Sequence, residues 1–324
     1  MKAIVCSEIT EDLSGVDLAD IAEPEPGPGE VKIQVKASSI NFPDILMCQG
    51  KYQFKPELPF SPGMEMAGVI VAVGAGVEHL KPGMRITGGN KTGGFAEYAI
   101  LPAGSVRELP DNFGYAEAAS FGAAYLTAYV SLVRRARIES GETLLIHGAS
   151  GGVGMATIDV GKMLGATVIA TSGSDAKLDA LTAYGADYVI NTRDGFRERV
   201  KELTGGKGAD VIFDPVGGDV FDESTRCIAF DGRLLVIGFT SGRIAEVKTN
   251  IPLIKGFSVV GVRAGEYGRR FPEKGRENMD AIWQMAAEGK TRPYIHDQLP
   301  LERVLDGFRM LQNREVIGKL VITP

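Results

Sequence analysis

The sequence predicts an α/β protein in which a doubly wound, parallel six-stranded sheet is inserted into a second domain made of short strands. Three observations lead to this prediction. The 324 residues are enough for about two domains. In the first third, short strands rich in Val and Ile are separated by Pro- and Gly-rich turns, which is typical of a small β-barrel. From residue 142 onward, short apolar strands alternate with amphipathic helices, which is the pattern of βαβ units around a buried parallel sheet.

The elements of the first third follow from local composition. The rigid segment Pro24-Glu25-Pro26-Gly27-Pro28-Gly29 predicts a turn, and the alternating residues behind it predict a strand. A second turn at residues 81–83 leads into another strand. The strands expected in this part are residues 2–6, 30–37, 68–73 and 84–86, with a further strand opened by residues 93–98.

After residue 115 the pattern changes to longer periods. Residues 116–134 are apolar at helical spacing. Strands are then expected at residues 143–147, 166–171, 187–190, 209–213, 232–238 and 257–262, with helices at 152–164, 175–184, 195–203 and 220–229. The tail predicts helices at 279–288 and 301–311 and a last strand at 318–323, which we expect to pack back on the first domain. The expected domains are therefore residues 1–121 with 264–324, and residues 122–263.

Composition excludes several classes of function. The net charge of −6 comes without any basic cluster, so nucleic acid and anionic membranes are not expected as partners. The longest apolar run, residues 66–77, is too short to span a bilayer. Acidic residues follow too soon after Met1 for a signal peptide, and the three distant cysteines fit a reducing compartment, so we expect a cytoplasmic protein. Glycine is enriched, at 42 residues, which indicates turns and close backbone approaches.

The segment between the first strand of the alternating region and its helix carries a dinucleotide fingerprint. Read from Ala149 it is A-x-G-x-x-G, with Gly151 and Gly154 at the second and third glycine positions. Gly151 would let the backbone approach a pyrophosphate, and Gly154 would let the helix pack closely on the strand. The helix N-terminus supplies N–H groups and the positive end of a dipole. The cofactor residues expected here are Ser150, Gly151, Gly152, Val153 and Gly154.

The end of the second strand favours NADPH over NADH. NAD enzymes usually have an acidic residue here, which holds the ribose 2′-hydroxyl. This chain instead has Ser172 and Gly173, with no acid before Asp175, and Lys177 follows one turn into the next helix. Hydroxyl donors and a positive charge suit a 2′-phosphate, which a carboxylate would repel. Alternatively, Lys177 is an ordinary solvated helix residue.

At this point the chain resembles the zinc-independent medium-chain dehydrogenase/reductases, specifically the zeta-crystallin-like NADPH:quinone oxidoreductases. The resemblance spans nearly the whole chain, and residues 41–56 look most like the quinone oxidoreductase-like branch. It rests on the stretches SSINFPD, GKY, PFSPGMEMAGVIVAVGAGV, GGFAEY, GASGGVG, DPVGG and GRLLVIGF. It implies a GroES-like barrel domain built from both chain ends, a Rossmann domain inserted between them, a nicotinamide in the cleft between domains, and a homodimer paired through the strand at residues 257–262.

The resemblance also bears on metal binding. Zinc-dependent relatives have Cys where Ser38 or Ser39 stands, and a His-Glu pair where Met64 and Glu65 stand. The three histidines of this chain, at positions 79, 147 and 296, are not paired at ligand spacing. We therefore expect no metal site, a structural Glu65 and a His147 that is buried or at a loop edge.

Without a Lewis acid, the expected substrates are ones that accept hydride readily, such as quinones or α,β-unsaturated carbonyls. By resemblance, the Asn41 amide would face the nicotinamide ribose or the substrate oxygen. Asp44 would orient other groups, or simply cap a helix after Pro43. Tyr52 would cover the pocket or donate a hydrogen bond, or only pack in the core. Asn41, Asp44 and Tyr52 are thus the candidate catalytic residues.

The resemblance places the remaining cofactor contacts after the strands of the parallel sheet, except for one on the helix that enters the cofactor domain. They are Thr127, Thr192, Gly217, Phe239, Thr240, Ser241, Val262 and Arg263.

Three functions remain open from the sequence. The first is NADPH-dependent quinone reduction. The second is NADPH-dependent reduction of an enoyl or 2-alkenal substrate, including an acryloyl-CoA-type thioester, although only the pairs Arg134-Arg135 and Arg269-Arg270 are candidates for holding the CoA phosphates. The third is a non-enzymatic NADPH-binding protein, because a fold does not by itself determine a function.

Overall fold

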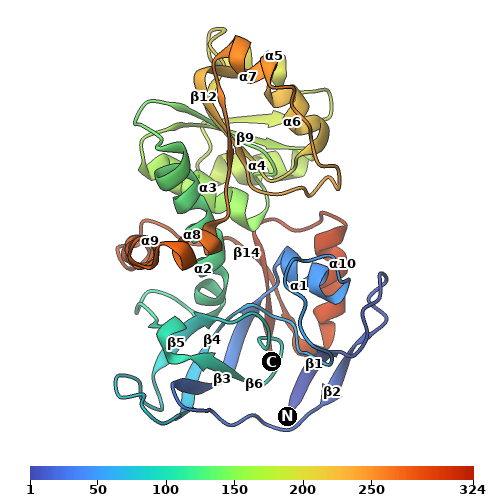
Figure 1. The fold of residues 1–324 in the computed structure, drawn as a ribbon, viewed down its shortest axis with the longest axis vertical. Helices are drawn as coiled ribbons and strands as arrows, with labels where there is room; N and C mark the ends of the chain where they lie inside the picture. Colours follow the sequence, from blue (N-terminus) through green and yellow to red (C-terminus); the bar gives the residue numbers. More distant parts are fainter. The chain divides into compact units, whose positions relative to one another are not determined.

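The computed structural model describes residues 1–324 and divides into two compact units (Figure 1). The first unit contains residues 1–122 and 292–324, so both chain ends belong to it. The second unit contains residues 123–291. An inserted domain is therefore observed, as the sequence predicts.

The second unit is built on a six-stranded parallel sheet in the order β10-β9-β8-β11-β12-β13. Numbered from the first strand of the unit, this order is 3-2-1-4-5-6, so the chain reverses direction across the sheet between β8 and β11. The predicted doubly wound sheet is confirmed. Its strands are β8 (Thr143–Ile146), β9 (Thr167–Ser172), β10 (Tyr188–Asn191), β11 (Ala209–Asp214), β12 (Ile228–Val236) and β13 (Ser258–Gly261).

Helices connect these strands, and the interior between helices and sheet is apolar. Leu145, Ile169, Ile212 and Leu234, from four different strands, are almost fully buried in one cluster. The helical segments are α2 (Tyr115–Tyr129), which begins in the first unit, the π-helical η2 (Val130–Ala136), α3 (Gly152–Met163), α4 (Asp175–Tyr184), α5 (Arg197–Leu203), α6 (Gly218–Ser224), α7 (Asn250–Lys255), α8 (Ala264–Arg270) and α9 (Pro272–Ala287).

The first unit is built on a seven-stranded sheet, in which six strands follow the order β14-β15-β3-β4-β5-β7 and the seventh, β6, pairs with β3; β1 and β2 form a separate pair. Its strands are β1 (Lys2–Cys6), β2 (Val16–Asp20), β3 (Glu30–Ser39), β4 (Glu65–Val73), β5 (Arg85–Gly89), β6 (Tyr98–Pro102), β7 (Val106–Glu108), β14 (Ile295–Pro300) and β15 (Lys319–Thr323). Its helices are α1 (Phe42–Cys48), η1 (Ala103–Ser105), η3 (Leu301–Arg303) and α10 (Val304–Gln312).

The long strand β3 carries the register that matters for function. It is antiparallel to β4, with Ser39 opposite Glu65, and antiparallel to β15, with Ser39 opposite Val321. The N–H of Ile40 donates to the carbonyl of Leu320 at 2.9 Å, so the pairing continues past the end of β3. The last strand thus lies beside the first domain's central strand, where the sequence predicts it.

Several predictions about element bounds are wrong; the helix expected at 279–288, for example, already begins at Pro272. The helix expected at 220–229 ends at Ser224, and β12 already begins at Ile228. The apolar run there belongs to an irregular strand whose pairing with β11 shifts between Ala209 and Val211, and Asp231 within it has a φ of 62°. In addition, α1, β2, β7, α7, α8 and β14 have no counterpart among the expected elements.

The second boundary between units also differs from the expected one. The sequence predicts this boundary between residues 263 and 264, whereas the second unit extends to Thr291 and so includes α8 and α9. These helices are tied to η2, because Arg134 bonds Asn278 Oδ1 and Glu277 Oε2, each at 2.7 Å. Such tertiary contacts leave no sign in local composition.

Candidate functional site

The loop between β8 and α3 has the conformation that a dinucleotide fingerprint requires. Gly148 has a φ of 55°, and a Cβ on Gly154 would lie 2.6 Å from both the Cα and the O of Ala149. Glycine is therefore required at 154 for the close packing of helix on loop, which confirms that part of the prediction. A Cβ on Gly151, in contrast, would meet only the Gly148 carbonyl, at 3.5 Å. The protein itself does not require glycine at 151.

The N-terminus of α3 is open to a negatively charged group. Its N-cap is the exposed Gly151, and no side chain caps the first turn. The first N–H groups of a helix have no partner within the helix, so they bind capping side chains, water or an anion. Together with the room left at Gly151, this geometry fits a pyrophosphate. The assignment of Ser150, Gly152 and Val153 as cofactor contacts stays a prediction.

Beside this loop, the ends of β9 and β10 bring three predicted residues together. The N–H of Thr192 donates to the carbonyl of Ser172 at 3.0 Å, and Thr192 Oγ1 would lie 3.7 Å from a Cβ on Gly173. Ser172 Oγ accepts the N–H of Ser174, the N-cap residue of α4. Lys177 stands in the first turn of α4 and is partly buried. Hydroxyl groups therefore lie at this edge, and Lys177 stands in the adjoining turn of α4; the contact of these residues with a 2′-phosphate stays a prediction.

An acidic residue also lies at this edge. Asp175, at the start of α4, accepts a 2.5 Å hydrogen bond from Asn191 Nδ2 and lies 4.0 Å from the guanidinium of Arg193. Its negative charge is thus partly balanced by protein groups. From the sequence, Asp175 is only the first acidic residue after β9, and its contacts with Asn191 and Arg193 are not predicted.

The ends of β11 and β12 form a second group of predicted contacts. Asp214 is buried, and its Oδ1 accepts the N–H groups of Val216 and Gly217 at 2.8 and 2.9 Å. Gly217 has a φ of 69°, and a Cβ there would lie 3.1 Å from the Phe239 ring. In the same loop, the Thr240 N–H donates to the Pro215 carbonyl, and the Ser241 N–H donates to the Val216 carbonyl.

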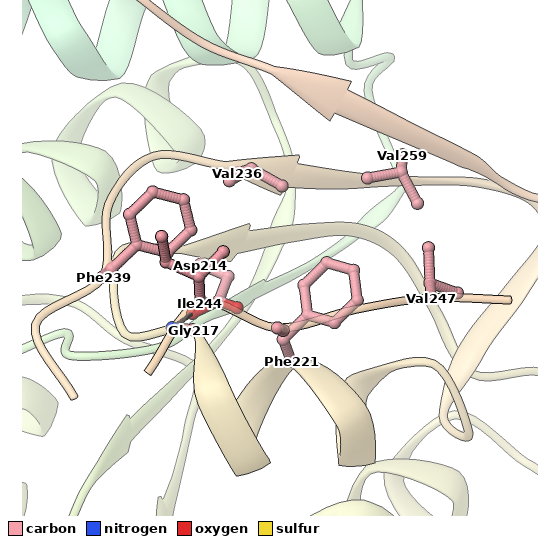
Figure 2. A pocket seen from close by; sticks show the side chains of 9 residues that line it. Asp214, Gly217, Phe221, Val236, Phe239, Ile244, Val247 and Val259 are labelled. Atoms are coloured by element: carbon pink, nitrogen blue, oxygen red, sulfur yellow. Dashed lines mark hydrogen bonds between the residues drawn. The ribbon is translucent and has the colours of Figure 1, made fainter. Parts of the chain in front are cut away.

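Under this loop lies an open pocket of about 150 Å³, shown in Figure 2. Phe221, Val236, Val247 and Val259 line it together with Phe239, and Asp214 is its one acidic residue. At the last strand, Val262 is buried and donates its N–H to Val236, whereas Arg263 is exposed at the start of α8. The predicted contacts Gly217, Phe239, Thr240, Ser241, Val262 and Arg263 all follow the carboxyl ends of parallel strands, where open α/β sheets bind ligands.

Two residues of the second unit have other roles. His147 is buried, with Nδ1 3.1 Å from Thr171 Oγ1 and Nε2 2.9 Å from Ser224 Oγ. Burial lowers the pKa of His147 to about 3, so the ring is neutral and structural, as expected. Thr127 donates its hydroxyl to the Ala123 carbonyl one turn earlier in α2, at 2.7 Å. The cofactor contact predicted for Thr127 stays a prediction.

In the first unit, Asn41 is the N-cap residue of α1 and lies in a polar cluster. Its N–H donates to Asp44 Oδ2 at 2.8 Å, and Asp44 Oδ1 accepts the Gly63 N–H at 3.1 Å. The amide Nδ2 of Asn41 donates to Glu65 Oε2 at 3.0 Å and contacts Ser39 Oγ at 3.3 Å. Both oxygens of Asp44 are thus used by the backbone, which agrees with an orienting and capping role.

The third ionisable group of this cluster is Lys319. Its Nζ donates to Asn41 Oδ1 at 2.6 Å and lies 3.6 Å from Glu65 Oε2, and the Lys319 side chain is only 7% exposed. Burial raises the pKa of Asp44 from 3.8 to about 7; the Asn41 and Gly63 N–H groups and the charge of Lys319 oppose this rise, and the charge of Glu65 adds to it. We call Ser39, Asn41, Asp44, Glu65 and Lys319 the barrel cluster.

Tyr52 does not join the barrel cluster. Its ring is partly buried against the apolar core of the first unit, next to Phe54 and Met64. Packing in the core is the alternative to a catalytic role that the sequence leaves open for Tyr52. A role in catalysis for Tyr52 stays a prediction.

Comparison with known proteins assigns the chain to a family. Residues 27–111 match the alcohol dehydrogenase GroES-like domain, and residues 152–284 match the zinc-binding dehydrogenase domain. The chain is 38% identical to a quinone oxidoreductase-like protein 2 homolog of Nematostella vectensis, over 99% of this chain and 88% of that protein. It belongs to the medium-chain dehydrogenase/reductase family, in its zeta-crystallin-like branch.

Solved structures of this family agree along the whole chain. A probable oxidoreductase from Mycobacterium abscessus has a TM-score of 0.90 at 35% identity, and the match covers 100% of this chain and 99% of that one. The quinone oxidoreductase of Escherichia coli, solved in complex with NADPH, has a TM-score of 0.90 at 29% identity, with 100% of each chain covered. The predicted GroES-like and Rossmann architecture is therefore confirmed.

Within this medium-chain dehydrogenase/reductase, the sequence analysis missed one member of the barrel cluster. Lys319 was not singled out, because it is 278 residues from Asn41 in the chain. Glu65, expected to be structural, has a carboxylate that contacts Asn41, Ser39 and Lys319, and these contacts agree with that expectation. The one available signal is the lysine that begins the last strand, directly before the apolar residues Leu-Val-Ile.

No helix of the structure is both long enough and apolar enough to cross a membrane.

Proposed function

We propose that the protein is an NADPH-dependent oxidoreductase that transfers hydride to quinones without a bound metal. The observation that carries the proposal is the edge of the parallel sheet, where an uncapped helix N-terminus at Gly151 lies beside the hydroxyls and lysine that follow β9. The NADPH complex of the related E. coli quinone oxidoreductase supports it. When bound, NADPH supplies the hydride equivalent.

The residues of this chain would hold and orient the cofactor. The N–H groups at the start of α3 would bind the pyrophosphate, and Gly151 leaves the space for it. The hydroxyl of Ser172 and the ammonium of Lys177 would bind the 2′-phosphate. The predicted contacts Gly217, Phe239 and Thr240 would line the remaining edge, where the Gly217 N–H is held by Asp214 and the Thr240 N–H by the Pro215 carbonyl.

The chemistry of the barrel cluster favours a reaction without metal. A catalytic zinc needs three protein ligands, mostly Cys and His, and positions 38 and 39 are serines. Ser38 Oγ donates to the Glu65 carbonyl at 2.7 Å, and Ser39 Oγ donates to Glu65 Oε2 at 3.3 Å. The carboxylate of Glu65 already faces the ammonium of Lys319. Its negative charge is therefore balanced without a cation from solution.

Steady-state oxidation of NADPH tests the function. The wild-type protein is given 1,4-benzoquinone, an alkyl enone or acryloyl-CoA in parallel, each with and without a chelator. We expect turnover with the quinone that is insensitive to the chelator. Faster turnover with the enone or thioester would replace quinone by an activated C=C as the substrate. NADPH binding without turnover of any acceptor would favour a non-enzymatic role.

We also propose a homodimer formed through β13. This strand is paired on one side only, with β12, so its other edge offers free backbone groups. Val259 on β13 is exposed, and so are the nearby apolar residues Phe230, Leu253 and Ile254, at 74–81% for the last three. Sedimentation at micromolar protein concentration should give the mass of two chains, and Val259→Asp should give one. A wild-type mass of one chain would refute the dimer.

A further inference from the structure

The ammonium group of Lys319 is buried in the first unit without contact to any predicted cofactor residue other than Asn41. Its partners are Asn41 Oδ1 at 2.6 Å and Glu65 Oε2 at 3.6 Å, and the side chains of Lys319 and Glu65 are 7% and 11% exposed. Burying a charge is unfavourable even when it is paired, and a buried ion pair is weak evidence of a role in stability alone. The placement of this lysine therefore calls for another explanation.

Strand register brings Lys319 to Asn41. In the β3–β15 pairing, Ser39 lies opposite Val321, and continuing the register by two residues places Asn41 opposite Lys319. The backbone of β15 is fixed at this point, because the Lys319 N–H donates to the Tyr294 carbonyl at 2.9 Å. A Cβ on the preceding Gly318 would lie 2.2 Å from the same carbonyl, which holds the strand close. The fixed backbone therefore directs the Lys319 side chain toward Asn41 and Glu65.

The contacts of Lys319 distinguish the two ends of the Asn41 amide. The oxygen accepts from an ammonium, and the nitrogen donates to the carboxylate of Glu65. Turning the amide by 180° would place its NH2 group against the ammonium and its oxygen against the carboxylate. Two charge-assisted hydrogen bonds would become two repulsive contacts. One orientation of Asn41 is therefore strongly preferred before any ligand binds.

We propose that Lys319 is a positioning residue for Asn41, whose ammonium group holds the amide oxygen so that Asn41 presents its amide to the ligand in a single orientation. The inference rests on the proposed function and on the expectation, implied by the family resemblance, that the Asn41 amide faces the nicotinamide ribose or the substrate oxygen. Lys319 acts through Asn41 and Glu65. Preorganised polar groups contribute to catalysis because they do not have to reorient during the reaction.

A double-mutant cycle tests whether Lys319 acts through Asn41. The variants are Lys319→Met, Asn41→Ala and the two combined, assayed for NADPH oxidation with 1,4-benzoquinone. We expect Lys319→Met to lower kcat/KM about tenfold or more, mainly through kcat, and the double variant to be no slower than Asn41→Ala within twofold. Lys319→Gln, which keeps a donor without the charge, should recover part of the loss. Independent, multiplying losses would overturn the proposal.

A matched control separates positioning from stability. Lys32 is also a buried lysine of the first unit, paired with Glu23 at 2.7 Å and Glu25 at 3.1 Å, and it has no contact with Asn41. Lys32→Met should lower the thermal midpoint and leave kcat within twofold of the wild type. If Lys32→Met and Lys319→Met lower kcat equally, Lys319 has only a structural role.

A measurement without turnover distinguishes failure of this inference from failure of the proposed function. In nitrogen-15 NMR spectra, the side-chain amide signal of Asn41 should move in Lys319→Met and in Lys319→Gln, while that of Asn191, in the other unit, stays in place. An unchanged Asn41 signal would overturn the inference whether or not the wild type reduces quinones. A moved signal in a protein that consumes no NADPH would refute only the proposed function.

Discussion

The carboxyl edge of the parallel sheet and the barrel cluster are built in different ways. At the sheet edge, the predicted residues lie at or shortly after strand ends, and many of the interactions involve backbone groups, such as the N–H groups bound by Asp214. In the barrel cluster, side chains from α1, β4 and β15 meet, and their charges are buried. The first arrangement is local and modular, whereas the second depends on strand register.

This difference determines what a substitution should do in each region. Loss of a side chain at the sheet edge should remove a predicted cofactor contact and leave the fold intact. Loss of one charge in the barrel cluster leaves its partner buried and unpaired, which lowers stability strongly. The following experiments test this contrast, beginning with the largest expected effect.

Removing the carboxylate of the barrel cluster should have the largest effect on stability. Glu65→Met leaves the Lys319 ammonium without its carboxylate, and we expect a loss of about 3 kcal/mol in the free energy of unfolding, measured in urea. Adding Lys319→Met to this variant removes the unpaired charge and should restore much of the loss. If the double variant is less stable than Glu65→Met, the ion pair is not the cause.

The two regions should respond to pH in opposite directions. Asp44 has a pKa of about 7 in the folded state against 3.8 ordinarily, so its contribution to stability is complete below about pH 4 and is lost as pH rises to 7. His147 has a pKa of about 3 against 6.5 ordinarily, so its contribution is complete above pH 6.5 and is lost as pH falls toward 3. Each slope approaches about 1.4 kcal/mol per pH unit.

Variants assign these slopes. His147→Phe removes the titrating ring and should therefore remove the loss of stability between pH 6.5 and 4. The hydroxyls of Thr171 and Ser224 keep their hydrogen bonds to the Ile146 and Val220 carbonyls in this variant. Asp44→Asn should instead remove the loss between pH 5 and 7. Unfolding free energies measured across this range decide the matter. If the unfolding free energies of the wild type and both variants change in parallel with pH, Asp44 and His147 do not cause the two opposite pH dependences.

Two glycines of one loop should separate fold from binding. Gly154→Ala places a Cβ 2.6 Å from Ala149 backbone atoms, and we expect a loss of about 2–3 kcal/mol in unfolding free energy together with lost NADPH affinity. Gly151→Ala meets only one carbonyl, at 3.5 Å, so its thermal midpoint should stay near that of the wild type while NADPH affinity falls. Equal destabilisation by both substitutions would show that Gly151 is not reserved for a ligand.

The smallest expected effect concerns cofactor preference alone. Lys177→Glu should weaken NADPH binding about 10- to 100-fold by calorimetry, because a carboxylate repels the 2′-phosphate, and it should change NADH binding little. Arg199→Glu, on the exposed face of α5, serves as the control for an equal change in net charge. Equal losses for both dinucleotides in Lys177→Glu would refute the phosphate assignment.

The sequence determined the class of fold, the six parallel strands and the place of the glycine loop, because these depend on periodicity and on glycines next to strands. It also pointed to Asn41 and Asp44. Tertiary structure alone decided that Lys319 joins them, that α8 and α9 belong to the second unit, and that Tyr52 packs in the core. Contacts between residues hundreds of positions apart depend on strand register and on burial, and neither property is encoded in any short stretch of the chain.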